Sequence, residues 1–331
     1  MLQNLVKPLD KRPRRNRKSE AIRSLVRETT LQTTDLIVPF FIVEGSNQKI
    51  PIPSMPNICR LSIDLLLKEC ELLHAQGIQA IALFPVIDPS LKDPSGKEAW
   101  NPHSLIPKAV KALKAEIPSL CVINDVALDP FTSHGHDGIA DPDGTIDNDL
   151  TIEALVKQAL CYAEAGTDIV APSDMMDGRV RAIRQALDAQ GFSQTSILSY
   201  AAKYASAFYG PFRNAIQTTL AFGDKKTYQM DPANKKEAIK EALLDEEEGA
   251  DLLLVKPGLP YLDIISAIKE KSSLPVGAYH VSGEYAMVMA AHSQGFLDAQ
   301  QTFYESLTCI KRAGADFIFT YAAKEVLGLL N

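Results

Sequence analysis

The sequence lacks several features that mark special classes of protein. No run approaches the ~18–20 uninterrupted apolar residues that span a bilayer, and residues 1–18 contain no apolar signal region. We therefore expect neither an integral membrane protein nor a secreted one. The five cysteines are an odd number, widely scattered, and none forms a C-x-x-C pair. This pattern favours reduced thiols in a cytoplasmic protein and argues against a structural zinc cage.

Nucleotide-binding signatures are also absent. The chain contains no G-x-G-x-x-G and no Walker A pattern, which counts against a doubly wound nucleotide-binding fold. Hydrophobic residues make up 46% and charged residues 23% of the 331 positions, a balance that supports a large core and excludes disorder of the whole chain.

Charge is unevenly distributed along the chain. Residues 1–27 carry nine basic side chains against two acidic ones, a net charge of +7, so the remainder carries −14. A basic arm could bind nucleic acid or anionic lipid. We favour docking on an acidic surface of its own or a neighbouring subunit, because an acidic body would repel nucleic acid.

Short apolar runs alternate with longer helical patterns beyond the arm. The runs are rich in Val, Ile, Leu and Phe and mostly do not alternate with polar residues, as expected for parallel strands buried on both faces. In the stretches between these runs, apolar residues recur with a period of 3.6 residues, which indicates amphipathic helices, for example over 63–75, 152–165, 235–247 and 299–313. The eight candidate strands are 36–43, 78–84, 120–126, 168–171, 196–200, 252–255, 275–281 and 317–321.

Four helix-to-strand junctions share one form. Gly77, Gly166, Gly249 and Gly314 each end a helical pattern, and a strand starts two or three residues later, usually after an Asp. Eight candidate strands, each followed by a helical pattern, predict an α/β fold, a (β/α)₈ TIM barrel over 36–331, with an extended basic N-terminal arm over 1–35. Functional residues should then lie just after the strands, at the carboxyl-terminal face.

Two lysines stand where buried strands end. Lys256 follows a run of apolar residues and Lys203 ends the preceding strand unit. At an ordinary pKa near 10.4, about one amine in 2,500 is neutral at pH 7. Burial and a second ammonium could lower that pKa to ~7–8, which suits Schiff-base formation with ketones or aldehydes. The alternative is a lysine that reaches the rim and pairs with a carboxylate.

The segment 124–138 is unusually polar, and Asp141, Asp143, Asp147 and Asp149 follow it. Asp129, His134, His136 and Asp137 offer oxygen and imidazole ligands, and oxygen-rich sites suit Mg²⁺ or Mn²⁺ better than Zn²⁺. The alternative is a surface loop whose aspartates form turns.

Two further groups carry charge after the strands. Arg213 and Lys225 could form a lid that holds a carboxylate, or could be an ordinary solvated pair. By sequence alone, the acidic run 245–248 is a solvated helix face.

Several segments together resemble the porphobilinogen synthase (5-aminolevulinate dehydratase) family. They occur in order over nearly the whole barrel. They are 125–138 (DVALDPFTSHGHDG), 171–179 (APSDMMDGR), 199–203 (SYAAK), 208–213 (FYGPFR), 255–258 (VKPG) and 279–285 (YHVSGEY).

The resemblance implies a lyase that condenses two 5-aminolevulinate molecules to porphobilinogen, losing two waters, in tetrapyrrole and heme biosynthesis. Lys256 would form a Schiff base with the substrate in one subsite, the A site, and Lys203 with that in the other, the P site. Holding both ketones together supplies the proximity advantage of an intramolecular reaction. The resemblance assigns the A-site carboxylate to Arg213, Lys225 and Gln229, the P-site carboxylate to Ser282 and Tyr321, and the P-site amino end to Asp125 and Ser173.

The chain departs from zinc-dependent relatives at the metal site. Those relatives place three cysteines where this chain has Ala127, Asp129 and Asp137, so a catalytic zinc thiolate site is excluded. The chain resembles the aspartate-rich, magnesium-responsive branch, which implies a distal Mg²⁺ at Glu246 and leaves Asp129 and Asp137 as candidate ligands. Lys225 stands where several relatives have arginine, which keeps the charge but not the bidentate geometry.

The resemblance also concerns assembly. It implies an allosteric homo-octamer in which the N-terminal arm wraps a neighbouring subunit. Two other functions remain open: a Schiff-base aldolase that uses a single lysine on the same barrel, and a nucleic-acid-binding protein that uses the basic arm.

Overall fold

The computed structural model describes residues 10–330. The chain forms two compact units, divided between Thr30 and Leu31. The described part of the first unit contains a 3₁₀ turn, η1 (Pro13–Arg17), and one short helix, α1 (Glu20–Leu25), and none of its residues is buried. The second unit begins before position 36, because Leu31 is 7% exposed and Asp35 pairs with Lys311 at 2.9 Å.

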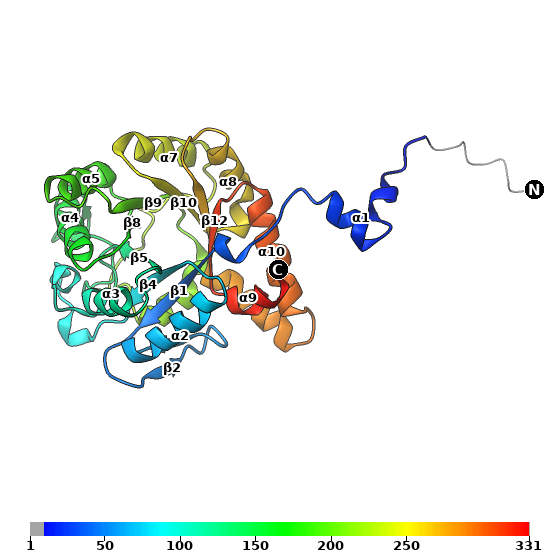
Figure 1. Cartoon of the computed structure of the whole chain (residues 1–331). Helices are drawn as coiled ribbons and strands as arrows, with labels where there is room; N and C mark the ends of the chain where they lie inside the picture. Colours follow the sequence, from blue (N-terminus) through cyan, green and yellow to red (C-terminus); the bar gives the residue numbers. More distant parts are fainter. Residues whose placement is uncertain (1–9, 331) are drawn as a thin grey trace, which may run out of the picture. The chain divides into compact units, whose positions relative to one another are not determined.

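A closed parallel barrel forms the centre of the second unit (Figure 1). Each strand pairs in parallel with its neighbours, and β12 pairs with β1 to close the ring. The predicted (β/α)₈ barrel is confirmed. Its eight strands are β1 (Leu36–Ile42), β4 (Ala80–Pro85), β5 (Cys121–Val126), β8 (Ile169–Pro172), β9 (Ser196–Lys203), β10 (Leu252–Lys256), β11 (Val276–His280) and β12 (Phe317–Thr320).

Helices surround the barrel and bury one face each against it (Figure 1). Two short helices, α6 (Gly210–Ile216) and α11 (Ala323–Val326), follow β9 and β12. The longer ones are α2 (Ile63–Ala75), α3 (Leu105–Glu116), α4 (Asn148–Glu164), α5 (Arg179–Ala189), α7 (Lys236–Glu248), α8 (Leu262–Lys269), α9 (Ser282–Ser293) and α10 (Ala299–Arg312).

The recurrent glycine and aspartate junctions have a structural reason. Gly249 (φ +103°) and Gly314 (φ +114°) adopt the left-handed conformation that ends a helix, as the pattern predicts. The aspartate two residues later accepts a hydrogen bond from a backbone N–H of a neighbouring strand. Asp251 accepts from Ile197 N, and Asp316 accepts from Val276 N, each at 2.7 Å. Each junction therefore ends a helix and fastens the next strand.

Some elements were not predicted. A short antiparallel pair, β2 (Lys49–Pro51) and β3 (Cys59–Leu61), extends β1, and a two-residue pair, β6 (Ile139–Ala140) and β7 (Ile146–Asp147), follows β5. The five cysteines are unpaired thiols, as expected. Within residues 10–330, no helix is long and apolar enough to cross a membrane.

Candidate active site

The two lysines stand side by side at the carboxyl ends of adjacent strands. Lys203 of β9 and Lys256 of β10 are Cα partners in the sheet register, and each is 6% exposed. Both line one cavity, together with Asp129, Tyr209, Phe212, Arg213, Lys225 and Gln229. The barrel therefore brings the two amines into one enclosed site, where parallel strands place functional residues.

Aromatic rings surround the amine of Lys256. Its Nζ lies 4.5 Å from the ring centre of Tyr279, 5.0 Å from Phe212, 5.2 Å from Tyr200 and 5.3 Å from Tyr209. Ring faces attract an ammonium ion, so the cage can hold the charged form. Burial, and next the charge of Lys203, lower the pKa of Lys256 to about 7. Both the neutral and the charged amine are therefore populated at neutral pH.

Lys203 lies in a more polar environment than Lys256. Its Nζ donates a hydrogen bond to Ser173 O and lies 3.5 Å from Asp137 Oδ2. Ser173 Oγ also donates to Asp125 Oδ2 at 3.0 Å. Burial raises the pKa of Asp125 to about 6, although Lys203 and Lys256 favour its charged form. The structure therefore places a carboxyl group that titrates near neutrality beside the lysine of β9.

Asp129 and Asp137 face an ammonium group. Lys225 Nζ lies 3.2 Å from Asp129 Oδ2 and 2.8 Å from Asp137 Oδ1, and Gln229 Nε2 donates to Asp137 Oδ2 at 3.4 Å. Despite burial, Lys203 and Lys225 lower the pKa of Asp137 to about 2. Asp129 and Asp137 in turn raise the pKa of Lys225, despite its burial. Lys225 is therefore a largely enclosed cation between two carboxylates, with its side chain 10% exposed, and not an ordinary solvated residue.

Residues 210–230, which we call the lid segment, cover this side of the cavity and carry Arg213, Lys225 and Gln229. Arg213 is exposed on α6 and lines the cavity. Arg60 fastens the end of α6, donating at 2.7 Å to Ala215 O from Nε and to Asn214 O from Nη2. Ser282, at the start of α9, also contacts the segment, since its Oγ accepts from Phe212 N at 3.0 Å.

Tyr321 and Glu246 complete the predicted set. Tyr321 follows β12 among the aromatic side chains of the barrel, and its Oη lies 2.9 Å from Tyr279 Oη. Glu246 lies outside the cavity, on α7, and its carboxylate accepts hydrogen bonds from Ser272 Oγ and Ser273 Oγ, each at 2.5 Å. These bonds lower the pKa of Glu246. Five of the predicted residues thus line one cavity, namely Lys203, Lys256, Arg213, Lys225 and Gln229, and Ser173 joins Asp125 to Lys203 beside it. Tyr321 lines a different hollow, with Phe40 and Ile58, and Glu246 lies outside both.

Comparison with known proteins gives the family. A profile of the delta-aminolevulinic acid dehydratase family matches residues 10–329. The chain belongs to this family. A delta-aminolevulinic acid dehydratase of Bradyrhizobium diazoefficiens is 55% identical over 94% of this chain and 88% of its own length, and one of Chlamydia pneumoniae is 52% identical over 98% and 97%.

A solved structure agrees with this assignment. The crystal structure of delta-aminolevulinic acid dehydratase (porphobilinogen synthase) from Toxoplasma gondii, in complex with the reaction product porphobilinogen, superposes with a TM-score of 0.95 and 52% identity. The match covers 97% of this chain and 92% of that one. The predicted family and enzyme class, a lyase of the porphobilinogen synthase type, are confirmed.

The dehydratase site does not fit a metal at the two candidate aspartates. Only two carboxylates are present, and the ammonium of Lys225 bonds to both. Within residues 10–330, no group of three or more His, Cys, Asp or Glu side chains could hold an ion. His136 is bonded instead to the lid segment, through Phe222 O and Tyr228 Oη. A cation at this position would have to displace Lys225.

Sequence reasoning missed a buried ion network behind the site. Arg179 is 2% exposed and pairs with Asp245 at 3.1 Å and with Asp174 at 3.6 Å. Ser199 Oγ donates to Asp245 Oδ2 at 2.6 Å. The acidic run 245–248 was predicted to be a solvated face, and for Asp245 that is wrong, because α7 turns this side chain toward β9. The one sequence signal was that Asp245 lies on the apolar face in the 3.6-residue period of this helix. The acidic residues that follow it obscured that signal.

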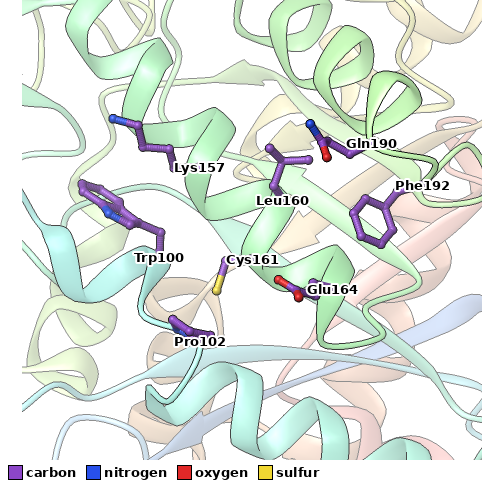
Figure 2. Close-up of a pocket in the computed structure, with 8 residues that line it drawn as sticks. All are labelled: Trp100, Pro102, Lys157, Leu160, Cys161, Glu164, Gln190 and Phe192. Atoms are coloured by element: carbon purple, nitrogen blue, oxygen red, sulfur yellow. The ribbon is translucent and has the colours of Figure 1, made fainter.

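One surface hollow has no connection to the lysines. It has a volume of about 440 Å³ and lies beside α4, where Figure 2 shows Cys161 and Glu164 of that helix near Trp100 and Phe192. Its lining shares no residue with the cavity that contains Lys203 and Lys256. We therefore assign the chemistry to the barrel cavity.

Proposed function

We propose that the chain condenses two molecules of 5-aminolevulinate to porphobilinogen, with loss of two waters, through Schiff bases on Lys256 and Lys203. A neutral amine attacks the ketone carbon, and water leaves as the C=N bond forms. The observation that carries the proposal is the pairing of both lysines across one register position in one cavity. The pKa of about 7 at Lys256 supports its role as the A-site nucleophile.

Asp125 and Ser173 have a proposed role at the P site. A carboxyl group whose pKa is about 6 can both accept and release a proton near neutral pH, as general acid–base catalysis requires. Ser173 contacts both Asp125 and Lys203, so it can orient the substrate amino end between them.

Two sets of residues are proposed to hold the substrate carboxylates. Arg213, Lys225 and Gln229 bind that of the A site, and Ser282 and Tyr321 that of the P site. Lys225 bonds to two aspartates in the structure. The substrate carboxylate therefore competes with Asp129 and Asp137 for the ammonium of Lys225. The substrate amino group can then replace that ammonium beside the two aspartates.

A direct assay tests the activity. The purified chain with 5-aminolevulinate should form porphobilinogen, measured by its colour reaction. Lys203→Ala should abolish product formation but leave Lys256 able to form an adduct. The alternative is a single-lysine aldolase, which would leave Lys203→Ala active in carbon–carbon bond cleavage. Persistent porphobilinogen formation by Lys203→Ala would contradict the role of Lys203.

Mg²⁺ is the cofactor that we propose, since enzymes of this family are metal-dependent. Mg²⁺ keeps several waters and uses one or two carboxylates, which a hydrated ion at Glu246 would satisfy. Glu241 is a competing position on the same helix. It lines a hollow with Asp177 and Glu237, and burial and then the charges of Asp245 and Asp177 raise its pKa.

Matched variants separate these two positions. Mg²⁺ should activate the enzyme, and Glu246→Ala should weaken that response, whereas Glu241→Gln should keep it. Loss of the Mg²⁺ response in Glu241→Gln alone would move the site away from Glu246. Unchanged responses to EDTA and Mg²⁺ in both variants would remove the helix from consideration.

The basic arm has a proposed partner, a second copy of the chain. We propose a homo-octamer in the cytoplasm, assembled through residues 1–35, without nucleic acid or membrane. Light scattering of the full chain should give an octamer that shrinks when residues 1–30 are deleted. Salt-dependent binding of DNA or RNA that is lost with the arm would favour the nucleic-acid alternative instead.

A further inference from the structure

His136 bonds to the lid segment from both sides of its ring. It lies in the loop after β5 and is 2% exposed. Its Nε2 lies 3.0 Å from Phe222 O, its Nδ1 lies 3.0 Å from Tyr228 Oη, and its ring stacks on that of Phe222 at 4.6 Å. Because a carbonyl oxygen only accepts, Nε2 carries a proton, and in the neutral ring Nδ1 then accepts from the tyrosine hydroxyl.

The two partners flank Lys225. Phe222 precedes it by three residues and Tyr228 follows it by three. Next to His136, Asp137 accepts from Lys225 Nζ at 2.8 Å. One histidine thus holds both ends of the short stretch that presents the proposed carboxylate-binding lysine.

The rest of the loop fits closely against the same segment. His134 O accepts from Ala221 N at 3.1 Å. Gly135 has φ +76°, and a Cβ there would lie 2.5 Å from Thr219 O, so only glycine permits this approach. The contact is therefore built from three consecutive residues, and the histidine supplies its side-chain bonds.

We infer that His136 is a positioning residue that fixes the lid segment in the arrangement in which Lys225 faces the cavity. The inference rests on the proposed function of Lys225. If the loop is already ordered, less conformational entropy is lost when the substrate binds. His136 therefore contributes to substrate affinity and not to bond making. It acts through Phe222 and Tyr228 and does not touch the substrate.

Replacement of the imidazole by a phenyl ring tests the inference. His136→Phe keeps the ring and its stacking but removes both hydrogen bonds. We expect the KM for 5-aminolevulinate to rise about tenfold, with kcat changed less than about threefold. Hydrogen exchange of the amides over 217–230 should become faster. His136→Gln, whose amide can still donate to Phe222 O, should recover part of the affinity.

A second histidine provides the control. His74, at the end of α2, also bonds through both ring nitrogens, to Ile78 O and to Ser119 Oγ, each at 2.9 Å. His74→Phe should lower stability while leaving KM within about twofold. If His136→Phe folds poorly, Tyr228→Phe removes one of the same bonds and should raise KM about threefold.

Three outcomes would overturn the inference. These are equal KM values in His136→Phe and His74→Phe, a raised KM without faster exchange over 217–230, and a loss confined to kcat. Failure of the proposed function is recognised separately, because the unaltered chain would then form no porphobilinogen.

Discussion

The reactivity of Lys256 should follow its own titration near neutrality. With a pKa of about 7, roughly half of the amine is neutral at pH 7, against about one part in 3,000 at an ordinary value of 10.5. Between pH 6 and pH 8 the neutral fraction rises about tenfold and then levels off. An unperturbed lysine would instead gain about a hundredfold over the same range, without a plateau.

The neighbouring charge gives a second perturbation. After burial, Lys203 is the largest cause of the lowered pKa of Lys256, so Lys203→Met should move the inflection to higher pH. Lys203→Arg is the matched control, because it keeps a positive charge and should leave the inflection near 7.

The assay is reductive trapping with borohydride. The probe is 4-oxopentanoic acid, which keeps the ketone and carboxylate of 5-aminolevulinate but lacks its amino group, so the pH profile reports on the enzyme amine. Peptide mapping by mass spectrometry then measures the initial rate of modification at Lys256. An inflection above pH 9 in the unaltered chain, or the same inflection in Lys203→Met and Lys203→Arg, would refute the reasoning.

Two stability predictions follow from buried charges. The folded pKa of Lys256 lies below its unfolded value, so the unfolded chain binds more protons between about pH 7 and 10.5, and stability rises with pH across that window. Lys256→Met should therefore be more stable at pH 7 by up to about 4 kcal/mol, a gain that shrinks toward pH 10 in urea unfolding and whose absence would contradict the lowered pKa. Arg179→Met leaves Asp174 and Asp245 buried without a cation and should cost about 3–5 kcal/mol, whereas a loss below about 1 kcal/mol would mean that the carboxylates are not charged in the fold.

Much of the fold can be predicted from the sequence because the strands are buried on both faces. All seven residues of β1 are buried, for example, so the strand reads as an uninterrupted apolar run. Helix α2 has the predicted bounds, 63–75, since its apolar period and the glycine at position 77 mark both face and end. Lys203 and Lys256 stand out for the same reason, as charges at the ends of apolar runs.

The partners of the charged side chains could not be predicted from the sequence, because the tertiary structure determines them. Lys225 lies 88 positions from Asp137, and nothing local indicates that the two bond. Arg179 and Asp245 are 66 positions apart and meet only once α5 and α7 pack behind β9. His136 appeared as a possible metal ligand, whereas both ring nitrogens bond to the lid segment. Residue types thus indicated the site, and tertiary contacts decided which groups are free to react.

The stoichiometry of trapping tests the central claim most directly, that two neighbouring amines each activate a ketone. The unaltered chain is incubated with saturating 4-oxopentanoic acid and reduced with borohydride. Its intact mass is measured by mass spectrometry, and its peptides are then mapped. We expect two modifications on one chain, one at Lys203 and one at Lys256. Saturation at a single modification on Lys256, with Lys203 unmodified at every probe concentration, would contradict the account.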